Sequence, residues 1–162
     1  MELKIFTVGG TIDKIYFDQK SKYEVGEPAI EQILEESNVT LPYQCERILQ
    51  KDSLELTDAD RQLIYQTIQA DPHRHIVITH GTDTMIQTAK ILQPLAGERV
   101  IVLTGAMMPA KFRESDAIFN IGGAIIAAQT LPPGVYIVMN GQVFDPLKLR
   151  KNVELNRFEA VA

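Results

Sequence analysis

Residues 75–84 read HIVITHGTDT, a run of β-branched side chains that passes directly into a glycine turn. Continuous rather than alternating hydrophobicity predicts that His75 to Thr79 form a strand buried on both faces of a sheet. The residues beyond the turn have helical spacing, so we expect a helix that begins near Thr82 and buries Met85, Ile86, Ala89 and Leu92. A strand, a short turn and a helix form the repeating unit of an α/β fold.

The same alternation extends in both directions along the chain. Further strands are predicted at residues 3–8, 99–103 and 135–139, with a weaker candidate at 47–50. Further helices are predicted from Pro28, from a capping box formed by Thr57 and Asp60, and from about Ser115. The side chains expected to face the core are Ile30, Ile33 and Leu34 in the first helix, Leu63, Ile64, Thr67 and Ile68 in the second, and Ile118, Ile121, Ile125 and Ala128 in the third. The expected architecture is a three-layer α/β domain with a mostly parallel sheet, whose ligands bind beyond the carboxyl ends of the strands.

Length and composition indicate one globular domain over residues 1–162. Lys and Arg number 16 against 21 Asp and Glu, and the resulting net charge of −5 argues against nucleic-acid binding. The apolar runs are too short to cross a membrane. Met1 is followed at once by Glu2 and a strand-like run rather than by a secretory signal, so a cytoplasmic location is expected. The single cysteine, Cys45, excludes an internal disulfide framework and is expected to be a small buried hydrophobe.

The histidines do not indicate a metal site. His73 and His75 are not part of a ligand pattern with Asp, Glu and Cys of the kind that metal binding requires. His80 is expected to be a packed or solvated side chain rather than a ligand. We therefore expect no bound metal.

Two glycine turns follow predicted strands and place hydroxyl groups at one edge of the sheet. Residues 9–12 (GGTI) lack the third glycine of a dinucleotide fingerprint and the lysine of a phosphate loop, so nucleotide binding is disfavoured, and a plain β-turn is the alternative. In residues 80–84 (HGTDT), a helix N-terminus could bind a carboxylate or an oxyanion, although Thr82 or Asp83 could instead be an N-cap. Two such turns at one edge favour a threonine-lined pocket.

The two turns together, in this order, resemble the two signatures of the bacterial-type L-asparaginases. Residues 21–26 (SKYEVG) resemble the mobile active-site loop of that family, Asp52-Ser53 its substrate loop, and residues 105–109 (GAMMP) a turn after a later strand. Lys151 lies at the spacing from Met139 that fits the segment with the family's catalytic lysine. The resemblance covers almost the whole chain and implies the fold of the family's N-terminal domain.

By resemblance, the function is the release of ammonia from the side-chain amide of L-asparagine or glutamine, without a cofactor. Thr11 would be the nucleophile that accepts the acyl group, with Tyr23 closing over it. In a second cluster, lysine polarises a threonine hydroxyl and aspartate holds the lysine; its members are Thr82, Asp83 and Lys151. These roles are chemically coherent, because a threonine hydroxyl becomes a useful nucleophile only beside a base or a cation.

The resemblance also implies how the substrate is held. Ser53 would bind the α-carboxylate of the amino acid, and Asp83 would bind its ammonium group. The oxyanion would face the backbone N–H of Thr82. The expected ligand is therefore a small amide amino acid.

Some residues depart from the family pattern. Val8, Leu54 and Met108 replace residues that are frequent in the family, but none is an implied catalytic position. The larger departure is length, because the family has a second, C-terminal domain that contributes a carboxylate to the neighbouring subunit's site, and 162 residues match only the first domain. We therefore expect a homodimer or larger homo-oligomer, in which a second subunit could supply the missing contact.

Alternative functions stay open. A non-catalytic amino-acid-binding or regulatory module could retain the same pocket. The tRNA-dependent amidotransferases, which share this domain, deamidate a group on a larger partner, but nothing in the sequence indicates an RNA surface. We also expect residues 18–27 to be mobile without a ligand, because they are polar and have few apolar anchors.

Overall fold

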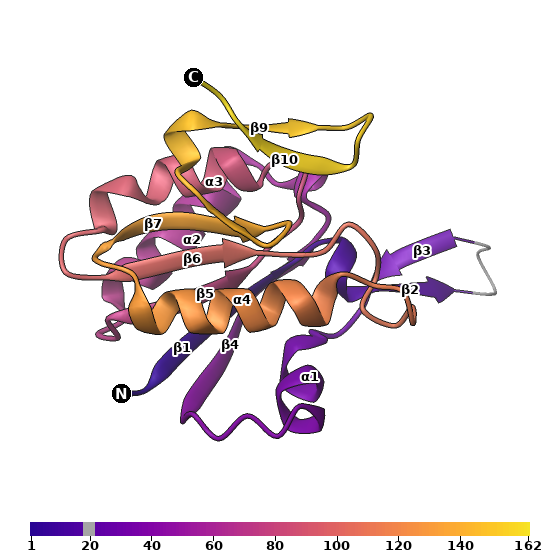
Figure 1. Ribbon diagram of the computed structural model, residues 1–162, viewed down its shortest axis with the longest axis horizontal. Coiled ribbons are helices and arrows are strands. Elements are labelled where there is room, and N and C mark those ends of the chain that lie inside the picture. Colours follow the sequence, from indigo (N-terminus) through magenta and orange to yellow (C-terminus); the bar gives the residue numbers. More distant parts are fainter. Residues whose placement is uncertain (18–21) are drawn as a thin grey trace.

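Six strands form one sheet in the order β4-β1-β5-β6-β7-β8 (Figure 1), in a computed structural model that describes residues 1–17 and 22–162. The first five strands of this order are parallel, and β8 pairs antiparallel with β7. Their bounds are Leu3–Gly9 (β1), Tyr43–Lys51 (β4), His75–Thr79 (β5), Val100–Thr104 (β6), Gly134–Met139 (β7) and Gln142–Phe144 (β8). The mostly parallel sheet is confirmed, and the weak candidate at 47–50 is the second half of β4.

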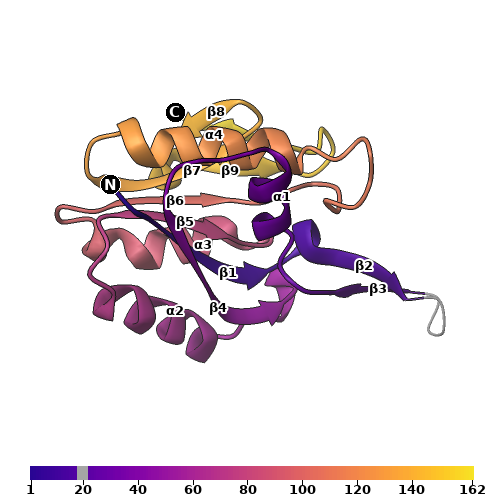
Figure 2. The same ribbon diagram turned by 90° about the horizontal axis from the view of Figure 1, so that it is seen from below.

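In the described part of the chain, four α-helices cover the two faces of the sheet, α2 and α3 on one and α1 and α4 on the other (Figure 2). Their bounds are Ile30–Glu36 (α1), Asp58–Ala70 (α2), Met85–Leu92 (α3) and Ala117–Thr130 (α4). The predicted capping box opens α2, with Thr57 and Asp60 each accepting from the other's backbone N–H. The three-layer α/β architecture is thus confirmed. None of the described helices is long and apolar enough to cross a bilayer.

Two side chains predicted to face the core are exposed instead. Leu63 on α2 is 44% exposed and Ile118 on α4 is 60% exposed. The buried row of α2 consists of Arg61, Ile64 and Ile68, and that of α4 includes Ala117, Ile121, Ala124, Ile125 and Ala128. In both helices the predicted core face is rotated relative to the buried face. The reason is that a charged residue in α2, Arg61, and small residues in α4, such as Ala117 and Ala124, hold core positions.

Strand β1 lies between β4 and β5. Along the chain, β4 is added on one side of β1 and β5 on the other, so the direction of strand addition reverses beside β1. Crossover helices leave this point on opposite faces, an arrangement that in doubly wound α/β domains forms a crevice at the carboxyl ends of the strands, here β1 and β5. In doubly wound α/β domains, ligands bind in this crevice. The two predicted glycine turns follow β1 and β5 and therefore lie where the fold predicts such a crevice.

Two hairpins lie outside the sheet. One pairs β2 (Lys14–Phe17) with β3 (Lys22–Val25) and extends away from the body of the molecule in Figure 1. The other pairs β9 (Leu149–Asn152) with β10 (Arg157–Ala160). Residues 22–25 were expected in an irregular loop and instead form a strand, while residues 18–21 lie outside the described residues. The mobility of this segment stays a prediction.

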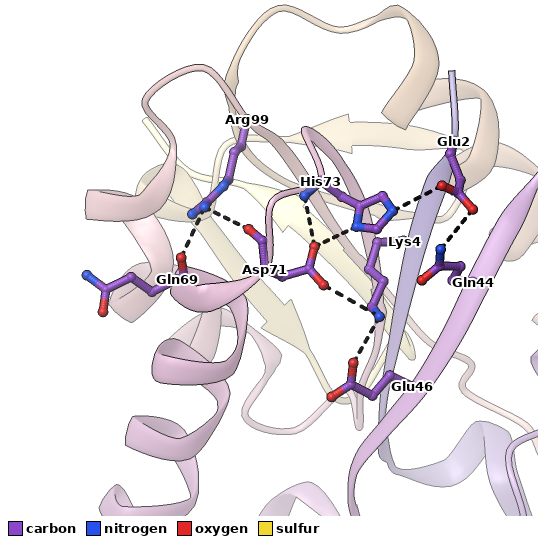
Figure 3. A network of polar contacts seen from close by, with 8 residues as sticks. All are labelled: Glu2, Lys4, Gln44, Glu46, Gln69, Asp71, His73 and Arg99. Carbon is purple, nitrogen blue, oxygen red and sulfur yellow. Dashed lines mark hydrogen bonds and ion pairs between the residues drawn. The ribbon is translucent and has the colours of Figure 1, made fainter.

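A network of charged side chains ties β1 to the end of α2 at the amino edge of the sheet, away from the glycine turns (Figure 3). The nearly buried Lys4 Nζ lies 2.9 Å from Glu46 Oε2 and 3.5 Å from Asp71 Oδ2. Burial opposes ionisation of Asp71, but hydrogen bonds from the backbone N–H and ring of His73 help to hold its pKa below the usual range. Because its charged groups bond to one another or to backbone oxygens, and lie at the opposite end of the strands from the glycine turns, we assign this network a structural role.

Candidate functional site

The two glycine turns contact each other at the carboxyl edge of the sheet. Gly10 has a φ of +94°, which residues with a Cβ rarely adopt. A Cβ on Gly10 would overlap the backbone N and Cα of Gly81, and a Cβ on Gly81 would overlap the side chain of Ser53. Glycine therefore lets three loops meet without side chains between them. This contact brings the loops of Thr11, Ser53 and Thr82 together.

Lys151 joins the two side chains that follow Gly81. Its Nζ lies 2.8 Å from Thr82 Oγ1 and 2.8 Å from Asp83 Oδ1. The Lys151 side chain is 16% exposed and Thr82 is 5% exposed, so water screens their interaction little. An ammonium that donates to a hydroxyl oxygen favours loss of the hydroxyl proton, and a carboxylate holds the ammonium in place. The arrangement is therefore able to activate a threonine hydroxyl.

The helix after β5 begins later than predicted. It starts at Met85, with Thr84 as N-cap and no side-chain cap. The Thr84 hydroxyl donates to the backbone oxygen of Ser53 at 2.8 Å, and its N–H donates to Ser53 Oγ at 3.3 Å. The N-cap interpretation of Thr82 and Asp83 is therefore wrong, because neither caps the helix and both side chains contact the lysine.

The hairpin β9–β10 places Lys151 beside the turn of Thr82 and Asp83. Phe158, which pairs with Lys151 in the hairpin, is 1% exposed and packs on Phe144 with 6.5 Å between ring centroids. The Phe158 N–H donates to Oδ1 of Asn140 at 2.8 Å, and Asn140 has a φ of +53° in the turn between β7 and β8. These contacts fix the hairpin on the core. They therefore hold Lys151 beside the turn of Thr82, which is distant in sequence.

An ion pair that the sequence does not predict joins the first hairpin to the Ser53 loop. Lys14 Nζ lies 2.6 Å from Asp52 Oδ2, and Asp52 Oδ1 accepts from the Leu54 N–H at 3.1 Å. Burial opposes ionisation of Asp52, but these two hydrogen bonds hold its pKa below the usual range. No local pattern signals the pair, because its members come from loops that meet only in the folded chain.

Tyr23 is the predicted site residue that stands apart from the others. It lies on β3, is 49% exposed, and has ring contacts with Tyr16 at 5.5 Å and Phe112 at 5.9 Å between centroids. Within the described residues, no hydrogen bond joins its hydroxyl to Thr11 or to another predicted site residue. Closure of Tyr23 over the nucleophile therefore stays a prediction.

Asp13, two residues after Thr11, is a buried carboxylate that the sequence analysis missed. It is 4% exposed, and its Oδ1 accepts from the Ala29 N–H at 2.9 Å, while its backbone oxygen accepts from the Gly26 N–H at 2.8 Å. Burial raises the pKa of Asp13 to about 6. Asp13 therefore anchors the end of the first hairpin and the start of α1 to the turn of Thr11.

We expect Asp13→Asn to raise the free energy of unfolding at pH 7 by as much as about 3 kcal/mol. The amide oxygen can still accept from Ala29, but no charge is buried. The pKa of Asp13 in the folded chain lies above the ordinary value of 3.8, so the wild-type carboxylate costs stability as pH rises from about 4 to about 6. Urea unfolding at pH 4 and pH 7 should show the advantage of the variant growing with pH. An equal difference at both values would contradict this account.

His80 and Cys45, two further residues considered in the sequence analysis, are packed into the fold. His80 is fully buried, as expected for a packed histidine. Cys45 is half-buried rather than fully buried, and burial raises the pKa of its thiol to about 12, with a further contribution from a hydrogen bond to Glu31. Among the residues that the structure describes, no group of three or more His, Cys, Asp and Glu is placed to hold a metal.

Comparisons with known proteins identify the family of the chain. The family model "Asparaginase, N-terminal" matches residues 2–161. L-asparaginase 2 of Escherichia coli (strain K12) is 31% identical over 160 residues, which cover 88% of this chain and 44% of that protein. A glutamyl-tRNA(Gln) amidotransferase subunit of Methanococcus vannielii is 40% identical over 87 residues, or 52% of this chain and 20% of that protein. The solved structure of the thermostable L-asparaginase from Thermococcus kodakarensis has a TM-score of 0.85 at 26% identity, over 99% of this chain and 51% of that chain.

The chain spans less than half the length of the curated relatives named here. The family match nevertheless runs from the first strand to the last and includes both glycine turns and the hairpin of Lys151. The similarity of structure extends over the same range. The chain therefore belongs to the asparaginase family, whose N-terminal domain it matches.

Proposed function

We propose that the chain forms, in the cytoplasm, the amide-attacking part of an asparaginase-like amidohydrolase that releases ammonia from L-asparagine. The observation that carries this proposal is the Lys151 ammonium, which lies 2.8 Å from both Thr82 Oγ1 and Asp83 Oδ1. Such a constellation suits the activation of a hydroxyl, because the ammonium can stabilise the oxyanion of the threonine and the carboxylate holds the ammonium in place. The L-asparaginases among its relatives support the same assignment.

In the proposed reaction, Thr11 Oγ attacks the carbonyl carbon of the substrate side-chain amide. Negative charge then develops on the carbonyl oxygen, which faces the Thr82 N–H. The hydroxyl proton of Thr11 passes to the amide nitrogen, and collapse of the intermediate breaks the C–N bond, expels ammonia and leaves the acyl group as an ester on Thr11. Water releases the acid in the second step, and the Thr82, Asp83 and Lys151 cluster assists proton movement in both steps.

Substrate orientation falls to the loop of Ser53 and to Asp83. Ser53 is buried at a loop fixed by Thr84 and by the Lys14–Asp52 ion pair, so its hydroxyl has a preset position for binding the α-carboxylate. Asp83 is partly exposed and would bind the substrate ammonium. Tyr23 would close over Thr11 from the first hairpin.

Ammonia release by the purified chain tests this proposal. The assay should compare L-asparagine, L-glutamine and the D-isomers, with L-asparagine expected as the fastest substrate. A chain that binds these amino acids in calorimetry but releases no ammonia would favour the second candidate, a non-catalytic amino-acid-binding module. Release from an amide only when a partner protein or tRNA is added would favour a component of an amidotransferase, the function named for the relative from Methanococcus vannielii.

We also propose that the chain forms a homodimer or larger homo-oligomer. Ile118, Phe119 and Ile126 on α4 and Val143 on β8 are exposed around a hollow of about 670 Å³. The sequence of α4 contains no charged residue, so two copies can bring this face together across a twofold axis without like-charge repulsion, although the chain has a net charge of −5. Light scattering at micromolar concentration should give at least twice the mass of one chain. Phe119→Glu should then reduce the measured mass towards that of one chain. A wild-type chain that is strictly monomeric would contradict the proposal.

A further inference from the structure

Three buried polar side chains adjoin the turn that carries Thr82, and we call them the buried relay. They are Arg61 on α2, Thr88 on α3 and His80 directly after β5. Arg61 is 5% exposed, and the other two are fully buried. Arg61 Nε lies 3.2 Å from Thr88 Oγ1, which lies 2.8 Å from His80 Nε2, and His80 Nδ1 lies 2.7 Å from the carbonyl oxygen of Gly81.

The position of every proton in the buried relay follows from these contacts. The Gly81 oxygen can only accept, so Nδ1 of His80 carries the proton and donates it. Burial lowers the pKa of His80 to about 4, which keeps the ring neutral at pH 7 and leaves Nε2 as an acceptor. The Thr88 hydroxyl therefore donates to Nε2. Its oxygen in turn accepts from Arg61 Nε, which can only donate.

The last link of the buried relay sets the orientation of one peptide group. In a trans peptide, the C=O and N–H point in opposite directions. Because His80 holds the Gly81 oxygen, the N–H of Thr82 points in the opposite direction, away from His80. Thr82 is 5% exposed, yet no residue in the described part of the chain accepts from its N–H. A buried backbone donor without a partner is rare and is suited to a developing oxyanion.

Arg61 also connects the buried relay to the substrate loop. Its Nη1 donates to the Leu56 backbone oxygen at 3.3 Å, at the end of the 3-10 helix Ser53–Glu55. Its Nη2 has no partner, and no carboxylate lies within ion-pair distance, among the residues that the structure describes. A buried guanidinium without a counter-ion is costly for stability alone. Its field opposes protonation of His80 and favours negative charge in the adjoining site.

We propose that the buried relay is a positioning device, which presents the Thr82 N–H to the oxyanion while Lys151 holds the Thr82 hydroxyl. The proposal rests on the proposed amidohydrolase function. Arg61, Thr88 and His80 are positioning residues in this account, since they reach the substrate only through the peptide between Gly81 and Thr82. Thr88 is the link that is most readily removed without a change of shape.

The first test compares Thr88→Val with Thr88→Ser. Valine keeps the shape of threonine but leaves His80 Nε2 without a donor and Arg61 Nε without an acceptor. We expect Thr88→Val to lower kcat for L-asparagine about ten- to a hundredfold with a smaller change in KM, because the oxyanion exists only during reaction. Thr88→Ser should stay within about threefold of wild type, because the hydroxyl remains. Thr67→Val, which removes a hydroxyl bonded to the Leu63 oxygen on α2, serves as a control for a generic effect of threonine loss.

The second test needs no activity. Nitrogen-15 NMR of histidine-labelled wild-type protein should show a neutral His80 ring with the proton on Nδ1 at pH 7. In Thr88→Val, the Nε2 resonance should move towards that of an imidazole nitrogen without a hydrogen bond, and in Thr88→Ser it should not. A charged ring or a proton on Nε2 in the wild type would overturn the relay even if the valine variant did not fold.

The outcomes separate this inference from the proposed function. If the wild type releases ammonia and folded Thr88→Val is equally active, the positioning role is wrong and the amidohydrolase stands. If Thr88→Val and Thr67→Val lose activity equally, the role is also wrong. If the wild type releases no ammonia, the proposed function fails and the positioning role fails with it, whereas the proton arrangement of the buried relay is still decided by NMR.

Discussion

Thr11→Ala and Thr82→Val should each reduce ammonia release from L-asparagine on the order of a thousandfold. The first change removes the proposed nucleophile, and the second removes the hydroxyl that Lys151 Nζ contacts at 2.8 Å. Because both hydroxyls serve one reaction, the double variant should lose little more than either single variant. The rate is measured by coupled ammonia detection at saturating substrate.

The melting temperature of both variants should stay close to that of wild type. A loss of activity can then be attributed to the missing hydroxyl and not to unfolding. Thr11 is half-buried in a turn held by backbone contacts, and valine has nearly the shape of threonine at position 82. Thr130→Val is a matched control, because its hydroxyl bonds the Ile126 oxygen at the far end of α4. Wild-type rates in both site variants would contradict the assignment.

Lys151→Met should lower the rate by about a hundred- to ten-thousandfold. Methionine retains much of the length and apolar character of the lysine side chain but cannot donate to Thr82 or pair with Asp83. Lys151→Arg should recover little activity, since a planar guanidinium cannot replace a compact ammonium that bonds two oxygens at 2.8 Å.

The control for this variant is Lys148→Met, which removes an exposed lysine from the neighbouring 3-10 helix Pro146–Lys148. It should leave both the rate and the affinity for L-asparagine unchanged. If Lys151→Met keeps more than about a tenth of the wild-type rate, the cluster around Lys151 is not the source of activation.

The order of elements could be predicted because each buried strand has a continuous apolar run that differs from the helical spacing beside it. His75–Thr79 has the predicted bounds, and the capping box of Thr57 and Asp60 is formed. The order of strands in the sheet could not be predicted, since it depends on which face each crossover helix covers. Strand β4 was underestimated because its exposed edge residues, such as Glu46, interrupt the apolar pattern.

The residues of the candidate site and the contact of Lys151 with Thr82 and Asp83 were expected by resemblance, but the loop contacts that surround them were not. Both glycine turns were found because backbone contact requires glycine at Gly10 and Gly81. The later start of α3 was missed because Thr82 and Asp83 have ideal capping chemistry and are held instead by Lys151, a contact between distant parts of the chain. Arg61 was overlooked because a charged residue is rarely fully buried, although its spacing from Ile64 and Ile68 matches the inner face of α2.

The anchoring of Lys151 by the hairpin β9–β10 has a consequence for protein synthesis. A ribosome makes Thr11 and Thr82 well before it makes Lys151 and the Phe158 side chain that fixes the hairpin on the core. A nascent chain can therefore assemble the strands and both glycine turns while Thr82 and Asp83 still lack their contacts with Lys151. Under the proposed function, a chain cut short before the hairpin would therefore be partly folded but inactive towards amides.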